Sequence, residues 1–283
     1  MFIADYHVHS EKSFDCTQPA SISDMLKTAA ENNINQVAIC DHYDVNWVLD
    51  GSNPKIDFKD SREQINRAKR EINCGTELLL GIELGQQHQS PEANAHAKEL
   101  LRGNNFDFIL CAMHNARNEP DFYFMDYKNP DKKLLEAMFE RYARELCELA
   151  EWHEFHALAH ADYPARYFKS NNVDIDAGKY YDLYAEAFKI IIRRGIALEI
   201  NTSGLCRENF RETMPSFNLL KIYKDLGGEL LTLGSDSHSA AQLADAPERF
   251  KFVYAKLLEL GFKYISVITN KKDKKFEQVK IIL

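Results

Sequence analysis

The sequence predicts an α/β fold in which parallel strands alternate with helices. Short apolar runs rich in β-branched residues recur seven times at intervals of roughly 30 to 50 residues, and a loop and a helical pattern follow each run. This alternation indicates parallel strands joined by right-handed crossovers. Because the predicted strands are nearly continuous apolar runs, both faces of the sheet should be buried, as in a barrel or a doubly wound sheet.

The elements follow in chain order. The predicted strands occupy residues 2–8, 36–42, 77–84, 106–114, 155–161, 196–203 and 229–236. The predicted helices occupy residues 22–33, 58–75, 130–152, 176–195, 218–228 and 247–261. A capping box of Ser21 and Asp24 opens the first helix, and Gly195 closes the fourth. An eighth strand candidate, 263–270, has a pattern that does not decide whether it joins a barrel.

Composition limits the classes of protein that the chain can belong to. With 283 residues, 45% of them hydrophobic, it can bury one core, and we expect a single domain over 1–283. The net charge of −8 argues against nucleic acid as the main partner. No apolar run approaches the ~20 residues of a membrane helix and no signal peptide is recognisable, so a cytoplasmic protein without a membrane partner is expected. No pattern indicates an oligomeric state.

The polar residues that interrupt the apolar strands lie almost entirely at the C-terminal ends of those strands. His7 and His9 are two residues apart on the first strand, so their side chains point to the same side. The other residues at strand ends are His42, Glu83, His114, His160, Asp236 and His238, with Asp15 in the loop after the first strand. In a βα barrel these ends meet at one mouth, where active sites form.

A single histidine at a strand end is more often a hydrogen-bonded structural residue than a metal ligand. Here six of the ten histidines, with two carboxylates, occupy the ends of six different strands, and chance placement does not account for that. Imidazole and carboxylate without thiolate suit Zn, Mn or Fe in a catalytic site. These candidate ligands exceed what two tetrahedral ions require, so three ions are expected.

These motifs resemble the polymerase and histidinol phosphatase (PHP) family of metal-dependent phosphoesterases. The matching segments are DYHVHS, CDHYD, GIELG, AMHN, LAHADYPARY, EINTSGL and GSDSH, in family order between residues 5 and 239. The EINTSGL segment and the arginine after AHAD are similar to the stand-alone histidinol-phosphatase branch. The resemblance implies a distorted (β/α)7 TIM-like barrel that holds three divalent metal ions.

The resemblance also implies how the ligands divide. The first ion would take His7, His9, Glu83 and Asp236; the second would share Glu83 and take His114 and His160; the third would take Asp15, His42 and His238. The implied activity is hydrolysis of L-histidinol phosphate to L-histidinol and inorganic phosphate in histidine biosynthesis. We expect a hydroxide that bridges two of the ions to attack phosphorus. Glu83 and Asp236 would act mainly as ligands, and His238 or a nearby water molecule would protonate the leaving group.

Substrate contacts are expected from residues that follow the fifth, sixth and seventh strands. Arg166 and Arg207 are candidates for phosphate binding because a guanidinium group pairs well with phosphoryl oxygens. Asn201 and Ser237 are further candidates for the pocket. Other candidates are Ser203 and Ser239 near phosphate, Asp41 and Asp162 as supports of ligand histidines or loop caps, and His88 in a substrate loop.

The aromatic and acidic loop 115–127 could read the imidazole and ammonium groups of the substrate, or its rings could simply pack the loop. The candidates there are Glu119, Asp121, Phe122, Tyr123 and Asp126. Two other functions stay open at this point. One is a phosphoesterase of the same fold that acts on another small phosphate ester or a nucleotide, and the other is a non-catalytic protein that keeps metals for stability.

Overall fold

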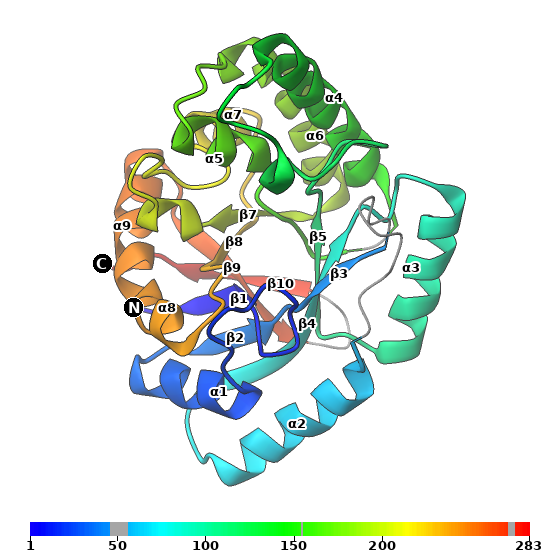
Figure 1. Ribbon diagram of the computed structural model, residues 1–283. Helices are drawn as coiled ribbons and strands as arrows, with labels where there is room; N and C mark the ends of the chain where they lie inside the picture. The colour runs from blue at the N-terminus through cyan, green and yellow to red at the C-terminus, as the bar shows by residue number, and fades with distance from the viewer. Residues whose placement is uncertain (46–55, 154, 271–274) are drawn as a thin grey trace.

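The computed structural model describes residues 1–45, 56–153, 155–270 and 275–283. These residues form a nearly closed barrel of seven parallel strands with helices around the outside (Figure 1), which confirms the predicted distorted (β/α)7 fold. The strand order is β1-β2-β4-β5-β6-β7-β8, and β3 pairs with β4. The barrel strands are β1 (Ala4–Val8), β2 (Gln36–Ile39), β3 (His42–Asp44), β4 (Glu77–Gly85), β5 (Phe108–Ala112), β6 (Ala157–Leu158), β7 (Ala197–Asn201) and β8 (Leu231–Gly234).

The second predicted strand, 36–42, is broken into two pieces, and this break is one source of the distortion. β2 pairs with both β1 and β4, whereas among the described residues β3 pairs with β4 alone, with His42 opposite Glu83 in the register. At the break, the backbone N–H of Cys40 donates to the carbonyl oxygen of Val8 at 2.7 Å. β3 therefore follows β4 toward the mouth of the barrel and carries His42 with it.

Two backbone hydrogen bonds join the first and last strands at the mouth. The N–H of Asp236 donates to the carbonyl of His7 at 2.8 Å, and the N–H of His9 donates to the carbonyl of Ser237 at 2.9 Å. A parallel bridge between Val8 and Ser237 accompanies them. This closure places the paired polar residues of β1 beside those that follow β8.

Helices cover the outside of the barrel and bury their apolar faces against the strands. They are α1 (Ile22–Glu31), α2 (Phe58–Glu71), α3 (Pro91–Asn104), α4 (Lys132–Glu151), α5 (Tyr163–Ser170), α6 (Tyr181–Arg194), α7 (Phe217–Asp225), α8 (Ala240–Ala244) and α9 (Ala246–Glu259). The predicted helices match α1, α2, α4, α6, α7 and α9 within a few residues at each end, whereas α3, α5 and α8 were not among the clearest patterns. The predicted caps are also present, because Ser21 accepts from the N–H of Asp24 and Gly195 has a φ of +66°.

The eighth strand candidate lies outside the barrel. β9 (Tyr264–Asn270) pairs antiparallel with β10 (Lys275–Lys280). The hairpin contacts residues at the N-terminal ends of the barrel strands: Ile268 donates its N–H to the hydroxyl of Tyr6 at 2.7 Å and accepts from the side-chain amide of Gln36 at 2.8 Å. It therefore closes the end opposite the mouth. Within the described residues, no helix is both long and apolar enough to cross a membrane.

Loops that follow the strands gather at the mouth, as predicted. The longest irregular stretches of the sequence, 43–58, 85–95, 115–131 and 203–216, all begin after a strand. Residues 46–55 of the first stretch lie outside the described residues. The second stretch ends early because α3 begins at Pro91, where Ser90 caps the helix by accepting from the N–H of Ala93 at 3.0 Å.

Candidate metal centre

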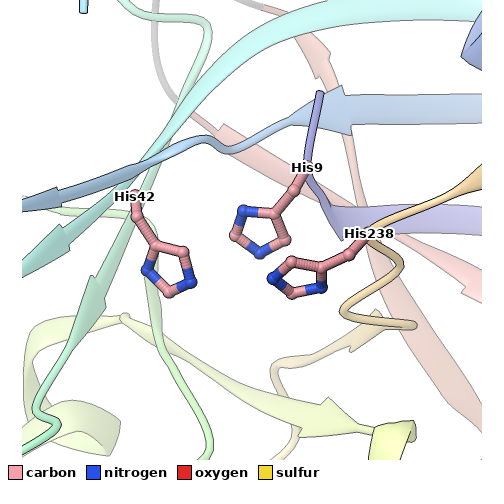
Figure 2. Close-up of side chains that lie close together, drawn as sticks. All are labelled: His9, His42 and His238. Carbon is pink, nitrogen blue, oxygen red and sulfur yellow. The ribbon is translucent and has the colours of Figure 1, made fainter. Parts of the chain in front are cut away.

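Side chains from six barrel strands and their loops meet at the C-terminal mouth. Figure 2 shows His9, His42 and His238 side by side, although they come from the end of β1, from β3 and from the loop after β8. The ring of His9 stacks on that of His42 with a centroid distance of 4.5 Å and on that of His238 at 4.1 Å. One ring nitrogen from each of the three lies within 4.8 Å of the other two. The sequence-predicted histidines of the first, second and seventh strands are thus brought together.

Glu83 lies at the centre of the cluster and is fully buried. Its oxygens lie 3.2 Å from Nε2 of His7, 2.8 Å from Nδ1 of His42, 3.1 Å from Nε2 of His114 and 2.9 Å from Nε2 of His160. One carboxylate therefore contacts imidazoles from four other strands. This is the arrangement required of a ligand shared between two ions.

Two further carboxylates complete the cluster. Asp236 Oδ1 lies 3.3 Å from Nε2 of His9 and 3.7 Å from Nε2 of His7. Asp15 Oδ2 lies 2.8 Å from Nε2 of His238 and 3.4 Å from Nε2 of His42. All nine candidate ligands thus lie in one cluster, in which Asp15 and His238 are the most exposed pair.

Buried atoms without partners indicate that this cluster fits divalent cations. Among the described residues, His7 Nε2, His9 Nε2, His42 Nδ1 and Glu83 Oε2 are buried, and although they lie close to one another or to Asp236, none of these contacts has the geometry of a hydrogen bond. Such atoms are costly unless a ligand satisfies them. The separations of roughly 3 to 3.7 Å also match the spacing of two donor atoms that each lie ~2.1 Å from a shared ion.

Glu199 is a functional candidate that the sequence reasoning missed. Its Oε1 lies 2.6 Å from Nδ1 of His7, and its Oε2 accepts from the backbone N–H of His160 at 2.8 Å. A carboxylate behind a ligand histidine fixes the tautomer that points Nε2 toward the metal. The feature of the sequence that could have identified Glu199 is the presence of an acidic residue inside an otherwise apolar strand.

Asp44 is the second missed candidate. Its Oδ1 lies 3.1 Å from Nδ1 of His114, and His42, Asp44 and His114 form a group with donor atoms within 4.8 Å of one another. Asp44 follows His42 by two residues on β3, so the spacing that identified the pair on β1 was also the signal here.

The third supporting carboxylate, Asp41, acts through a serine. Ser13 Oγ donates to Asp41 Oδ1 at 3.1 Å and lies 3.0 Å from Nδ1 of His9. Since the serine proton points to Asp41, the Nδ1–H of His9 donates to Ser13, and Nε2 of His9 is left facing the cluster. Asp162, the other proposed support, instead accepts from the backbone N–H of Ser216 at 3.0 Å.

The backbone at Asp236 is held in an uncommon conformation. Its φ is +55°, in the left-handed region, where aspartate is tolerated better than most residues. The hydrogen bond from its N–H to His7 holds this turn in place, and Nδ1 of His238 lies 2.9 Å from its carbonyl oxygen. The turn therefore aims both the Asp236 carboxylate and Nε2 of His238 at the cluster.

The pKa values of the cluster show strong coupling between acids and imidazoles. Burial alone would raise the pKa of Glu83, but the charges of His42, His7 and His114 hold it well below its ordinary value. Burial also opposes the charged form of His114, yet Asp44 and Glu83 outweigh it and raise the pKa of His114 to about 10. The buried carboxylates thus require positive charge beside them, which protons on the imidazoles supply when no cation is bound.

A cavity of about 590 Å³ opens over the cluster. Of the four predicted substrate contacts, Arg166 and Arg207 line this cavity, and Asn201 and Ser237 are not among the described residues that do. Asn201 instead donates to Asp236 Oδ2 at 3.3 Å, and Ser237 shares a 2.6 Å hydrogen bond with Ser235. Ser203 lines the cavity, whereas Ser239 caps α8.

The two arginines differ in environment. Arg166 is buried, donates to the hydroxyl of Tyr167 at 2.7 Å and lies 3.6 Å from Asp236 Oδ2. Its guanidinium carbon lies 4.7 Å from the centroid of the Tyr163 ring and 4.9 Å from that of Tyr167. Arg207 is the more exposed of the two, and partial desolvation of its charged group, together with the charge of Arg166, lowers its pKa. Arg166 is thus the more rigid cation at the cavity wall.

Some of the remaining candidates line the cavity and others do not. Asp121 and Tyr123 from loop 115–127 line the cavity, while Phe122 is buried against Tyr142 and Phe168. The side chain of His88 is 3% exposed, and Nε2 of His88 lies 3.9 Å from Glu145. His88 is not among the described residues that line the cavity.

Sequence comparison gives consistent matches. A family model described as the PHP domain matches residues 5–203. A probable histidinol-phosphatase of Clostridium acetobutylicum is 30% identical over 241 residues, which cover 83% of this chain and 86% of that protein. A probable histidinol-phosphatase of Thermotoga maritima is 27% identical over 266 residues, which cover 93% of this chain and 94% of that protein.

Structural comparison gives the same fold. The crystal structure of histidinol phosphate phosphatase from Lactococcus lactis, in complex with zinc, L-histidinol and phosphate, superposes with a TM-score of 0.73. The match has 20% sequence identity and covers 97% of this chain and 98% of that one. The arrangement of barrel strands and helices is therefore shared along nearly the whole length of both chains.

Proposed function

Because this chain belongs to the PHP domain family, we propose that it is a metal-dependent phosphomonoesterase that hydrolyses L-histidinol phosphate to L-histidinol and inorganic phosphate. The observation that carries the proposal is the cluster of nine imidazole and carboxylate side chains beneath a cavity that also contains Arg166. The two curated relatives are named as probable histidinol-phosphatases, and this chain aligns with each of them over most of its length. The proposal includes one catalytic domain over 1–283 and a place for the reaction in histidine biosynthesis.

The proposed cofactors are three divalent ions, of zinc, manganese or iron. Three groups of side chains would hold them: His7, His9, Glu83 and Asp236; Glu83, His114 and His160; and Asp15, His42 and His238. In every group each imidazole has a nitrogen within 3.7 Å of a carboxylate oxygen of the same group, and Glu83 contacts members of all three. Bound at these positions, divalent cations neutralise phosphoryl oxygens and lower the pKa of a water molecule that serves as the nucleophile.

The protein's own groups bind and orient the phosphate ester. Arg166 offers a buried guanidinium group that pairs with phosphoryl oxygens, and its contacts with Tyr163 and Tyr167 hold it in place before the substrate arrives. Arg207 adds a second, more exposed positive charge at the cavity wall. Together they favour a dianion in a chain whose overall charge is negative.

One side chain orients the nucleophile and another group protonates the leaving group. Asp236, whose Oδ2 faces Arg166, accepts a hydrogen bond from the attacking hydroxide, and the proton that water loses to form this hydroxide goes to solvent. A water molecule beside His238, at the edge of the cavity, donates a proton to the leaving alkoxide oxygen, and His238 itself does so only where its Nε2 does not hold a cation. Asp15, 2.8 Å from Nε2 of His238, keeps that ring oriented toward the cavity.

Removal and return of metal tests the proposal. The protein is treated with a chelator, dialysed and reloaded with zinc or manganese, and both bound metal and phosphate release from L-histidinol phosphate are measured. We expect phosphate release to disappear in the chelated protein and to return as up to three ions bind per chain. Undiminished phosphate release from protein with no detectable metal would contradict the proposal, as would His9→Ala protein with wild-type turnover.

A further inference from the structure

We propose that the carboxylate of Asp121 binds the ammonium group of the substrate. This contact would make the enzyme prefer phosphate esters that carry an amine. This inference deepens the proposed function and rests on it. Asp121 lies in the loop after β5, directly before a 3₁₀ turn at Phe122–Phe124, and it lines the cavity. Among the described residues of the cavity wall, it is the carboxylate that lies apart both from the candidate ligands and from Asp44, which contacts His114.

One oxygen of Asp121 is fixed by the protein and the other is not. Oδ1 accepts from the backbone N–H of Tyr123 at 2.8 Å and from the hydroxyl of Tyr163 at 3.1 Å. No described residue donates a hydrogen bond to Oδ2. A carboxylate that is held by one oxygen at the wall of a cavity presents its second oxygen to a cationic group without further reorganisation.

A directed chain of hydrogen bonds connects Asp121 to the phosphate-binding arginine. Arg166 donates to the hydroxyl of Tyr167 at 2.7 Å, and the hydroxyls of Tyr167 and Tyr163 are 2.8 Å apart. Because a guanidinium group can only donate and a carboxylate can only accept, the hydrogen bonds all point the same way. Tyr167 donates to Tyr163, and Tyr163 donates to Asp121. The negative end of this chain is Asp121, and the positive end is Arg166.

The spacing of the two ends suits a substrate with phosphate and ammonium on neighbouring carbons. In L-histidinol phosphate the amine-bearing carbon is bonded to the carbon that carries the ester oxygen, so the two charged groups are close and of opposite sign. Three hydrogen bonds separate the guanidinium of Arg166 from the carboxylate of Asp121 along the wall. A phosphate bound at Arg166 therefore leaves the ammonium group within reach of Asp121.

The other acids of the loop are already engaged elsewhere. Glu119 forms an ion pair with Arg141, and Asp126 Oδ1 accepts from the backbone N–H of Lys128 at 2.8 Å. Neither lines the cavity among the described residues. Of the acids that the sequence suggested for substrate recognition, Asp121 is thus the one that the structure leaves facing the cavity.

Exposed rings beside Asp121 complete the subsite. Tyr123 and Phe124 both line the cavity and are 65% and 49% exposed, although large rings are usually buried. The two rings meet edge to face, with centroids 4.9 Å apart. Either ring offers an apolar face to the imidazole ring of a substrate whose ammonium group is bound at Asp121.

The test compares two substrates in two forms of the metal-loaded enzyme. Asp121→Asn keeps an oxygen that accepts from Tyr123 and Tyr163 but removes the negative charge. The substrates are L-histidinol phosphate and its deamino analogue, an imidazolylpropyl phosphate. We expect wild-type kcat/KM to favour the amine-bearing substrate by roughly 10- to 100-fold, the range of a charged hydrogen bond. The variant should lose most of this preference by slowing on the amine-bearing substrate alone.

A matched control is Asp126→Asn, which makes the same substitution in the same loop outside the cavity and should leave the preference unchanged. Equal losses on both substrates in Asp121→Asn would indicate a structural role through Tyr163 and would overturn the inference, as would an unchanged preference. If wild-type enzyme hydrolyses neither substrate, the proposed function fails on its own. Calorimetric binding of L-histidinol and its deamino analogue then tests Asp121 separately, with weaker binding of the amine alone expected in Asp121→Asn.

Discussion

Glu199 accepts a hydrogen bond from Nδ1 of His7 across 2.6 Å, so a carboxylate on β7 orients an imidazole on β1. Its second oxygen accepts from the backbone N–H of His160. The side chain is buried beneath the cluster and does not line the cavity among the described residues. One residue thereby couples the orientation of two candidate ligands that lie far apart in the sequence.

Neutralising Glu199 should weaken metal binding while the barrel stays folded. Glu199→Gln keeps an acceptor oxygen but also offers an amide that competes for the same position, so His7 loses its fixed orientation. We expect metal affinity to fall roughly 10- to 100-fold, the usual cost of losing such a support. Calorimetric titration with metal measures the affinity. The control is Glu148→Gln, which removes the charge from an exposed ion pair with Arg117. Equal affinity in the two variants would refute the role of Glu199.

Adding one methyl group at Gly85 should displace Asp44 and so disturb the candidate metal centre. Gly85 lies opposite Asp44 in the β3–β4 register, and a Cβ atom there would overlap Asp44 Oδ1. In Gly85→Ala the carboxylate has to move away from His114, so both stability and metal affinity should fall, the former by about 1–3 kcal/mol. Chemical denaturation and metal titration check the two effects.

Gly103→Ala is the matched control for that substitution. Gly103 lies in α3, and a Cβ atom there meets nothing within 4 Å. Alanine is the better helix former by about 0.5–1 kcal/mol, so this variant should be as stable as wild type or more stable, with unchanged metal affinity. Similar losses in both variants would show that the contact with Asp44 is not the cause.

His88 should make the protein sensitive to mild acid. Burial, with a smaller effect from the charge of Arg117, lowers the pKa of His88 to about 3. The unfolded chain binds the proton with an ordinary pKa near 6.5, so the folded state loses stability as the pH falls from about 6.5 toward 3. At pH 5 the loss is about 2 kcal/mol. In His88→Gln the decline in unfolding free energy between pH 8 and pH 5 should be smaller by this amount.

The comparison uses metal-free protein for every variant, so that release of metal in acid does not contribute. His153→Gln serves as a control because His153 is exposed. Denaturant titrations at the two pH values give the difference directly. An identical pH dependence in wild type and His88→Gln would contradict the assignment of a buried neutral imidazole at this position.

Local patterns predicted the alternation of parallel strands and helices and the set of polar residues at the strand ends, whereas the choice of a barrel over a doubly wound sheet came from the family resemblance. Side chains alternate along a strand, so spacing alone showed that His7 and His9 share a face, and the convergence of strand ends follows from parallel topology. The same spacing between His42 and Asp44 indicates a second pair. Its meaning emerges only from the distance between Asp44 and His114, which depends on the break between β2 and β3.

Features that depend on long-range packing could not be predicted in this way. In the sequence, Glu199 is simply an acidic residue within an apolar strand. Its role depends on the closing of the barrel, which brings β7 near His7. The segment 263–270 has the composition of a barrel strand, but its hydrogen bonds with Tyr6 and Gln36 place it across the opposite end. The roles proposed from position for Asn201 and Ser237 stay predictions, since their observed partners are other protein groups.

The central claim is that this site hydrolyses L-histidinol phosphate, and the kcat/KM of metal-loaded protein across phosphate monoesters tests it most directly. The panel contains L-histidinol phosphate, an aryl phosphate and a nucleoside monophosphate, each at saturating metal. The account predicts that L-histidinol phosphate exceeds the other two by at least about 100-fold, because its ammonium and imidazole groups both find partners in the cavity. Equal values for L-histidinol phosphate and the aryl phosphate would contradict it.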